Sequence, residues 1–209
     1  MFNYLILNNG AYLYDVKNQK GNYINNLNRD IAKKITEHFK DMAEAIVFCT
    51  TEKYYMYKSE IKSKKNYWVK VNEFEEVQDT IARMNIYAKT NEELIQYKKY
   101  INENFNDTNI IFMQDTDTGN NRRWLVLNPN GINKSVTLEK LCKELNINMH
   151  EAMFFGDGPN DIETIQKVGL GVAMGNALPQ VKAKAKAITL SNEEDGIAVF
   201  LERNIMKNK

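Results

Sequence analysis

The residues best suited to chemistry lie in the loop Gly156-Asp-Gly-Pro-Asn-Asp161. An apolar stretch at residues 152–155 predicts a strand before the loop, and a helical apolar pattern follows it. Asp157 lies at the end of that strand, in a tight turn between two glycines. Its carboxylate offers the oxygen ligand that Mg²⁺ prefers, together with oxygens of a substrate phosphate. Asn160 can hydrogen-bond a phosphate oxygen, and Asp161 lies where the dipole of the next helix favours a negative charge. The residues alone fit a magnesium and phosphate site and an ordinary strand–turn–helix with a capping aspartate equally well.

The elements around this loop alternate between helix and strand through the last third of the sequence. Leu138, Leu141 and Leu145 share one face of a predicted helix. Ser191 and Glu194 have the spacing of a capping box before the final helix. Such alternation predicts βαβ units and a parallel sheet, in which ligands bind beyond the carboxyl ends of the strands. The further predicted elements are strands at residues 171–174 and 188–190 and helices at 162–168 and 178–186.

The first two thirds predict a different architecture. Residues 2–7 and 11–14 predict two short strands, and Asn8-Asn-Gly10 between them can adopt the positive φ angles of a tight hairpin. Helices and strands then mix as far as residue 127, which predicts an α+β module with an antiparallel sheet. Its predicted strands are 46–48, 54–57, 83–89, 110–113 and 124–127, and the predicted helices are 30–42, 72–84 (with Asn72 and Glu75 as a capping box) and 91–105 (capped by Asn91).

The composition excludes several classes of protein. The 209 residues include 28 basic and 27 acidic side chains, with a net charge of +1, which argues against a basic nucleic-acid binder or a polybasic membrane-surface protein. No apolar run approaches the roughly 20 residues that span a bilayer. Cys49 and Cys142 lie far apart without a CxxC spacing, which argues against a disulfide scaffold or a structural zinc site. We therefore expect a soluble protein of the reducing cytoplasm, with neither nucleic-acid nor membrane partners.

Several stretches, most of them in the last third, form a recognisable set of motifs. They are Gly156-Asp-Gly-Pro-Asn-Asp-Ile-Glu-Thr-Ile165, Val168-Gly-Leu-Gly-Val-Ala-Met-Gly-Asn-Ala177, Val181-Lys182, Ser191-Asn-Glu-Glu-Asp-Gly-Ile197, Pro129-Asn-Gly-Ile-Asn-Lys134 and Leu7-Asn-Asn-Gly-Ala11 with Tyr14-Asp15. Together they closely resemble the haloacid dehalogenase (HAD) superfamily, and more narrowly its Cof-type sugar-phosphatase branch. The resemblance implies an α/β fold with a partial HAD Rossmann-like, parallel-sheet core (residues 1–15 and 126–209). It also implies an α+β type-2 cap (residues 16–125) that lies over the site and selects the substrate.

The resemblance also implies roles for individual residues. Lys134 matches the lysine of the third motif, which steadies the phosphate, and an ammonium group is a compact charge that suits a phosphoryl group. Asp157 matches the Mg²⁺-binding aspartate of the fourth motif. Asp161 matches the second acid of that motif, which orients Lys134 or metal-bound water, and Asn160 matches a position that contacts substrate phosphate. For an arbitrary lysine, a solvated position at a helix start would be the better interpretation, and the flanking motif reverses that preference here.

The sequence departs from the family pattern at its beginning. In this family an N-terminal strand ends in DxDGT, whose first aspartate attacks phosphorus and whose second acts as general acid and base, and a serine or threonine motif follows. This sequence begins after both motifs, and no residue before Asn9 supplies the nucleophilic carboxylate. Because the family's reaction passes through a covalent aspartyl-phosphate, we expect no turnover above background from the isolated chain.

One stretch imitates the absent motif. Asp115-Thr-Asp-Thr-Gly119 follows an apolar run, but it falls between two predicted cap strands, and its glycine and threonine stand in the wrong order. A hairpin loop rich in turn-forming residues is the better interpretation.

Other features favour structural rather than chemical roles. His38 and His150 have no partner spacing and are expected at the surface or at helix ends. The aromatic residues between Tyr54 and Trp68 are expected to pack the cap sheet, with a sugar pocket as the alternative. A solvated helix face is expected for three alternating lysines, Lys182, Lys184 and Lys186.

Two functions of different classes fit these residues. The first is a Mg²⁺-dependent hydrolase, a phosphatase of small phosphorylated metabolites such as sugar phosphates, that obtains its nucleophile from outside this sequence. The alternative is a catalytically inactive remnant, or a binding protein for a phosphorylated ligand. Without the nucleophile-bearing strand, the core sheet would expose an edge, so we also expect either a rearranged sheet or a homodimer that covers this edge.

Overall fold

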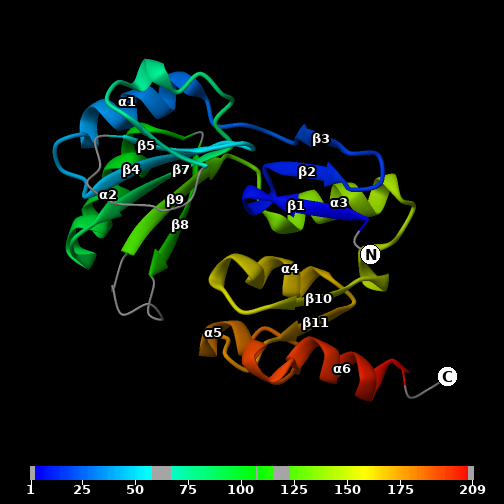
Figure 1. Ribbon diagram of the computed structural model, residues 1–209. Helices are drawn as coiled ribbons and strands as arrows, with labels where there is room; N and C mark the ends of the chain where they lie inside the picture. The colour runs from blue at the N-terminus through cyan, green and yellow to red at the C-terminus, as the bar shows by residue number, and fades with distance from the viewer. Residues whose placement is uncertain (1–2, 58–66, 107, 115–122, 207–209) are drawn as a thin grey trace. The chain divides into compact units, whose positions relative to one another are not determined.

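The computed structural model describes residues 3–57, 67–106, 108–114 and 123–206. The chain divides into two compact units, Met1–Ile132 and Asn133–Lys209, and each is described here by itself (Figure 1). None of the helices in the described ranges combines the length and the apolar character that a membrane crossing requires. The expected assignment of residues 1–15 and 126–209 to one domain and 16–125 to another stays a prediction.

The first unit begins with a small antiparallel sheet of β1 (Tyr4–Leu7), β2 (Tyr12–Asp15) and β3 (Lys20–Tyr23). The predicted turn between β1 and β2 is confirmed, with φ angles of 50° at Asn8, 55° at Asn9 and 106° at Gly10. The sequence did not predict β3, because Lys-Gly-Asn-Tyr has little strand propensity. The ring of Tyr12 occupies the space beside its glycine, since a Cβ on Gly21 would lie 2.0 Å from the hydroxyl of Tyr12.

A six-stranded sheet forms the rest of this unit, in the order β6-β5-β4-β7-β9-β8. All neighbouring strands are antiparallel except β5 and β6. Alternate residues of β4, β7 and β9 pack against α1 (Arg29–Phe39) and α2 (Asn91–Asn104) in one buried core, which includes Phe48, Met84 and Leu125. The strands are β4 (Ala45–Cys49), β5 (Tyr54–Tyr57), β6 (Trp68–Val71), β7 (Arg83–Ala88), β8 (Thr108–Gln114) and β9 (Arg123–Pro129).

The predicted helix at residues 72–84 is wrong. Only a single 3-10 turn, η2 (Phe74–Glu76), forms there, and its capping box joins Glu73 and Glu76 rather than Asn72 and Glu75. Val77 and Ile81 are buried in the loop that follows, and Met84 is buried in β7. The apolar spacing therefore came from loop and strand residues that pack on the same core as the helices.

Smaller corrections concern the helix ends of the first unit. The first helix ends at Phe39, before the predicted Met42, and Thr90 caps α2 in place of Asn91. His38 is exposed in the last turn of α1, as expected for a residue at the surface or at a helix end, and it stacks on Tyr100 with ring centroids 3.6 Å apart.

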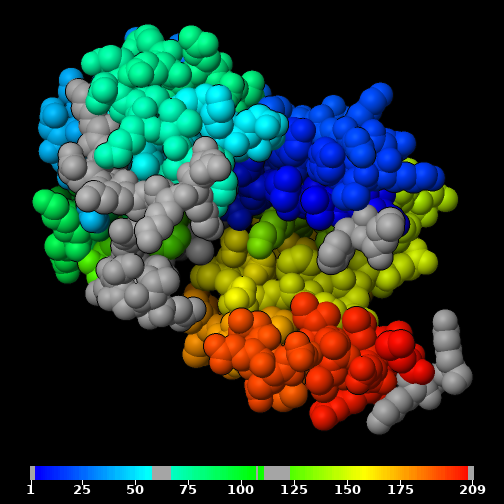
Figure 2. Space-filling model, in the orientation of Figure 1, coloured from blue at the N-terminus to red at the C-terminus, as the bar shows by residue number. Residues whose placement is uncertain are grey.

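The second unit contains the predicted parallel sheet, with the strand order β10-β11-β12. Ile165 of α4, Ala173 of β11 and Val181 of α5 form its buried core. On the C-terminal helix α6, Phe200 is buried, and its ring packs 5.5 Å from that of Phe155. Figure 2 shows α6, in red, at the surface of this unit. The elements are α3 (Lys134–Glu144), β10 (Met153–Gly156), α4 (Ile162–Lys167), β11 (Leu170–Ala173), α5 (Pro179–Lys182), β12 (Ala187–Ile188) and α6 (Gly196–Asn204).

Two predictions for this unit needed correction. The predicted helix at residues 178–186 is the single turn α5, so Lys184 and Lys186 lie beyond it. The ammonium groups of Lys182 and Lys186 donate to the carbonyls of Gly175 (2.5 Å) and Gly169 (2.7 Å), so these two lysines are not a solvated helix face.

The capping box of Ser191 and Glu194 is present, but it closes a 3-10 turn, η5 (Asn192–Glu194). The final helix, α6, begins only after Asp195, which has a φ of 53°. A left-handed residue thus separates the capped turn from the helix that the sequence placed directly after it.

The core of the first unit can be tested with two isoleucines of the same helix, α2. Ile101 is fully buried and Ile95 is 64% exposed. We expect Ile101→Ala to lower the free energy of unfolding by about 2–5 kcal/mol, because it leaves a cavity, and Ile95→Ala to change it by less than about 0.5 kcal/mol. Urea unfolding followed by tryptophan fluorescence reports on this unit, since Trp68 and Trp124 both lie in its sheet. Equal effects of the two substitutions would contradict the packing described.

Candidate phosphate and magnesium site

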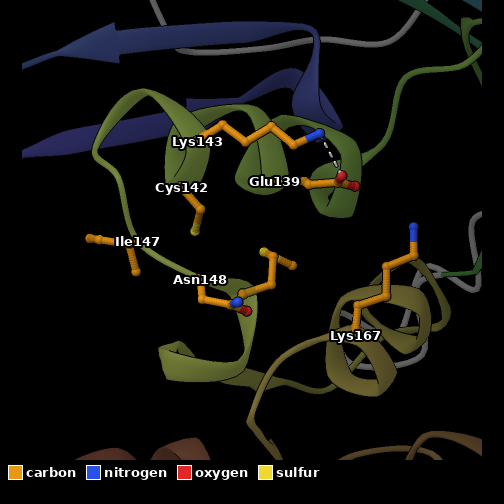
Figure 3. Close-up of a pocket in the computed structure, with 7 residues that line it drawn as sticks. Glu139, Cys142, Lys143, Ile147, Asn148 and Lys167 are labelled. Atoms are coloured by element: carbon orange, nitrogen blue, oxygen red, sulfur yellow. Dashed lines mark ion pairs between the residues drawn. The ribbon is translucent and has the colours of Figure 1, made fainter.

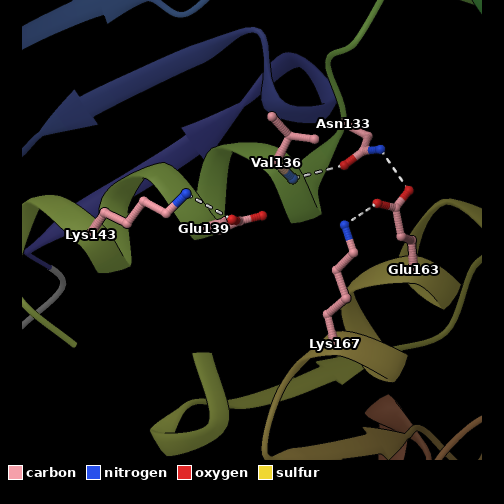
Figure 4. Close-up of polar contacts among 6 residues, drawn as sticks. All are labelled: Asn133, Val136, Glu139, Lys143, Glu163 and Lys167. Atoms are coloured by element: carbon pink, nitrogen blue, oxygen red, sulfur yellow. Dashed lines mark hydrogen bonds and ion pairs between the residues drawn. The ribbon is translucent and has the colours of Figure 1, made fainter. Parts of the chain in front are cut away.

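The start of α3 positions Lys134, the first residue of that helix. Asn133 caps the helix in an extended conformation, and its Oδ1 accepts a hydrogen bond from the N–H of Val136 at 2.9 Å. The Nδ2 of Asn133 donates to Glu163 of α4 at 2.7 Å. Glu163 also pairs with Lys167 at 2.7 Å, as Figure 4 shows. The first turn of α3 is thereby tied to α4 by a chain of polar contacts.

Lys134 forms an ion pair with Asp161. Its Nζ lies 2.6 Å from Oδ1 of Asp161, although the two residues are 27 positions apart in the sequence. The side chain of Asp161 is only 4% exposed and that of Lys134 is 31% exposed, so the lysine is not the freely solvated group of the alternative interpretation. Part of the Lys134 side chain therefore remains accessible to the solvent.

The second oxygen of Asp161 shapes the loop that follows β10. Its Oδ2 accepts hydrogen bonds from the backbone N–H groups of Asp157 (3.0 Å) and Gly158 (3.1 Å). Space is tight beside both glycines of this loop. A Cβ on Gly156 would lie 2.5 Å from the Cβ of Asp161, and one on Gly158 would lie 2.6 Å from Oδ1 of Asn160. The glycines therefore allow the loop to close around the buried carboxylate.

Asp157 is exposed at the carboxyl end of β10, and its Oδ2 accepts a hydrogen bond from Nδ2 of Asn176 at 3.3 Å. The structure thus gathers Lys134, Asp157 and Asp161 around one loop. Asn160 lies in the same loop, within the 3-10 turn η4 (Pro159–Asp161). The arrangement is the predicted one, and the chemical roles of the four residues stay predictions.

The donor set fits a magnesium ion that shares its coordination with a substrate. Within the described residues, no group of three or more histidine, cysteine or acidic side chains is arranged to hold a metal. Mg²⁺ is commonly bound by one or two carboxylates together with water and phosphate oxygens. The exposed carboxylate of Asp157 meets that requirement, whereas Asp161 is already committed to Lys134 and to two backbone N–H groups.

Three contributors to this region were not predicted. Glu163 and Asn176 lie inside motifs that the sequence analysis quoted without giving these residues a role, and Lys182 was assigned to a solvated face. The Asn133–Glu163 and Asp157–Asn176 contacts join residues 30 and 19 positions apart. Proximity of this kind leaves no spacing signal in the sequence.

The Asp115–Gly119 stretch that imitates the family's nucleophile motif lies outside the described residues, as do residues 58–66 of the aromatic stretch. Of the remaining aromatic residues, Tyr55 and Tyr57 pack in the core on the helix side of the six-stranded sheet. Tyr54 packs on the other face, in a separate cluster, with its ring 5.2 Å from that of Trp68. Sheet packing thus accounts for these rings, and a sugar pocket stays a prediction.

The second unit also has a pocket of about 380 Å³ that contains none of the predicted site residues. Figure 3 shows it between the C-terminal half of α3, the segment 147–149 and Lys167. Its two lysines already have acidic partners, since Lys143 pairs with Glu139 at 2.9 Å and Lys167 with Glu163. The pocket is therefore a poor site for an anion. It is lined by Glu139, Cys142, Lys143, Ile147, Asn148, Met149 and Lys167.

Comparison with known proteins decides the family. Residues 1–201 match the profile of the haloacid dehalogenase-like hydrolases. The chain belongs to this family. The expected family and the expected fold class, a HAD-type parallel-sheet core with an α+β cap, are confirmed.

Curated relatives and solved structures agree with this assignment. An HMP-PP phosphatase of Yersinia pseudotuberculosis is 31% identical over 133 residues, which cover 63% of this chain and 46% of the relative. The match therefore spans about half the length of that relative. A haloacid dehalogenase-like hydrolase from B. subtilis shares the fold with a TM-score of 0.80 and 20% identity, over 97% of this chain and 79% of that one. A sugar phosphatase of HAD subclass IIB superposes with a TM-score of 0.77 and 20% identity, over 97% and 75%.

The stability of the loop can be tested at Asp161. We expect Asp161→Asn to lower the free energy of opening around β10 by about 2 kcal/mol, because it removes the charge that pairs with Lys134. This is less than the ~3–5 kcal/mol for breaking a fully buried pair, since the lysine is partly solvated. Amide hydrogen exchange of β10 and β11 measures the change. Glu139→Gln, which breaks the exposed pair with Lys143, is the control, and an effect as small as the control's would contradict the account.

Proposed function

We propose that the second unit holds the phosphate- and magnesium-binding part of a HAD phosphatase that acts on small phosphorylated metabolites. The observation that carries the proposal is the ion pair of Lys134 and Asp161. The carboxylate of Asp161 also accepts the backbone N–H of Asp157, so the pair lies beside the loop that contains Asp157. A lysine held by a buried aspartate, with its side chain partly exposed, suits the binding of a doubly charged phosphate ester.

Each residue of the site has a distinct task in this proposal. Lys134 binds a non-bridging phosphate oxygen through its ammonium group, and Asp161 fixes the direction of that group. Asn160 binds a second phosphate oxygen through its side-chain amide. Asp157 holds Mg²⁺, and the bound ion would neutralise negative charge on the phosphoryl oxygens. The attack on phosphorus belongs, by family resemblance, to an aspartate of a DxDGT motif, and none of these four residues takes that task.

The substrate class rests on the relatives. One curated relative is named an HMP-PP phosphatase, and one solved structure with this fold is a sugar phosphatase. Both names describe proteins that act on small phosphorylated molecules, and we propose sugar phosphates as the class for this chain. Residues 16–125 would form the cap that selects among them. We also propose a cytoplasmic location, because Cys49 and Cys142 are free thiols.

Phosphate binding tests the proposal directly. We expect inorganic phosphate with Mg²⁺ to bind the chain, and Lys134→Ala to weaken this binding at least about tenfold, since one charge-assisted contact is worth about 1.5–3 kcal/mol. Lys143→Ala removes a lysine from the same helix and should leave the affinity unchanged. Titration calorimetry gives the comparison, and equal affinities for all three proteins would overturn the proposal.

Turnover separates the phosphatase from the alternative, a protein that only binds a phosphorylated ligand. The assay is the hydrolysis of p-nitrophenyl phosphate with Mg²⁺. Turnover that is lost in Asp157→Ala and kept in Asp115→Ala would establish hydrolysis at the proposed site. Phosphate binding without turnover would favour the binding protein, or a site completed by a carboxylate from another segment.

The edge of the parallel sheet leads to a prediction about assembly. Among the described residues of the second unit, β10 pairs only with β11, so one side of this apolar strand forms an edge of the sheet. We propose that a second copy of the chain covers it, because exposed apolar edges promote strand pairing. Light scattering should give a dimer for the wild type and a monomer for Met153→Lys, which puts a charge on this edge. Ile188→Lys on β12, at the opposite edge, should stay dimeric. A monomeric wild type would contradict the proposal.

A further inference from the structure

The side chain of Asn176 links Asp157 to a backbone group of a distant segment. Its Nδ2 donates to Oδ2 of Asp157 at 3.3 Å, and its Oδ1 accepts from the N–H of Asn192 at 3.2 Å. Asn192 is the first residue of η5. The two contacts fix the orientation of the amide, because a flipped amide would lose both hydrogen bonds. The amide therefore presents a donor to the Asp157 carboxylate in one defined direction.

The turn that carries Asn176 is held on several sides. The N–H of Ala177 donates to the carbonyl of Met174 at 2.9 Å, which closes the turn, and the N–H of Gly175 donates to Leu190 at 3.0 Å. Lys182 donates to the carbonyl of Gly175. A Cβ on Gly175 would lie 2.6 Å from the backbone nitrogen of Ser191, so the turn and the start of η5 are in close contact. This packing keeps the amide of Asn176 within reach of both of its partners.

The backbone segment that donates to Asn176 is also ordered. Both the N–H and the hydroxyl of Ser191 donate to Oε2 of Glu194, at 3.1 and 2.5 Å. These two bonds, of which the hydroxyl's has the larger effect, hold the pKa of the Glu194 carboxyl below its ordinary value. Glu194 is therefore ionised at neutral pH. A charged acceptor strengthens the capping box, and the capping box sets the direction of the N–H of Asn192.

We propose that Asn176 is a positioning residue for the magnesium ion, acting through Asp157. The proposal rests on the function proposed above, in which Asp157 holds the ion. Asp157 is exposed on a slim turn, and without a partner its carboxylate would rotate among several rotamers. Asn176 restrains this rotation by binding Oδ2, and the carboxylate so oriented would hold the cation. Partners of metal ligands in other proteins contribute about 10–100-fold to metal affinity.

The test measures metal binding rather than turnover. Mg²⁺ is titrated into the labelled chain with inorganic phosphate present, and the amide shifts of Asp157 and Gly158 are followed by NMR. The wild type should bind Mg²⁺, Asp157→Ala should lose this binding, and Asn176→Ala should bind about 10–100-fold more weakly. The unfolding midpoint in the absence of Mg²⁺ is recorded for each protein, so that lost affinity is separated from lost structure.

A second variant removes only the backbone end of the link. Asn192→Pro deletes the N–H that Asn176 accepts from, at a position where proline is well tolerated because it is the first residue of a helical turn. The preceding Ser191 has a φ of −68° and a ψ of 168°, which suit a residue before proline. Asn192→Ala is the matched control, since it keeps the N–H. We expect weaker Mg²⁺ binding in the proline variant and wild-type binding in the alanine variant.

The outcomes separate this inference from the proposed function. If the wild type binds Mg²⁺ and Asp157→Ala does not, but Asn176→Ala and Asn192→Pro bind as the wild type does, the positioning role is overturned and the proposed function stands. If the wild type does not bind Mg²⁺ in the presence of phosphate, the magnesium part of the proposed function is overturned, and the positioning role with it. Selective loss of affinity in Asn176→Ala and Asn192→Pro supports the inference.

Discussion

The candidate site depends on the buried carboxylate of Asp161. One of its oxygens binds the ammonium group of Lys134, at the start of α3, and the other accepts two backbone N–H groups from the loop after β10. A nearly buried charge is costly unless it is paired and hydrogen-bonded. The helix start and the loop must therefore keep their positions for this charge to stay paired and hydrogen-bonded. Because the backbone N–H of Asp157 is one of these partners, the same requirement fixes the position of Asp157.

A layer of polar contacts supports this arrangement from outside. Glu163 binds the capping side chain of α3, and Asn176 binds the carboxylate of Asp157. These residues come from different elements of the second unit, and their partners are themselves fixed by capping or by turns. A site that binds a charged group gains from such support, because its charges need less reorganisation when the ligand arrives.

The sequence predicted the parallel sheet and the motif residues well, because both depend on local patterns. Apolar segments predicted β10, β11 and the helix α4 between them, and the glycines around Asp157 indicated a tight loop. Patterns failed where packing took over. Val77 fitted the spacing of a helix face but is buried in a loop. Strand β3 was not predicted, because Gly21 and its neighbours have low strand propensity. The contacts of Asn176 could not be predicted, since its partners lie 19 and 16 positions away and asparagine is common in turns.

The most direct test of the central claim is a crystal structure of the chain with Mg²⁺ and phosphate. The account predicts a phosphate oxygen within hydrogen-bond distance of Nζ of Lys134, with the Lys134–Asp161 pair retained and Asp157 bound to the metal ion. Phosphate bound elsewhere, or a metal ion that does not contact Asp157, would contradict it.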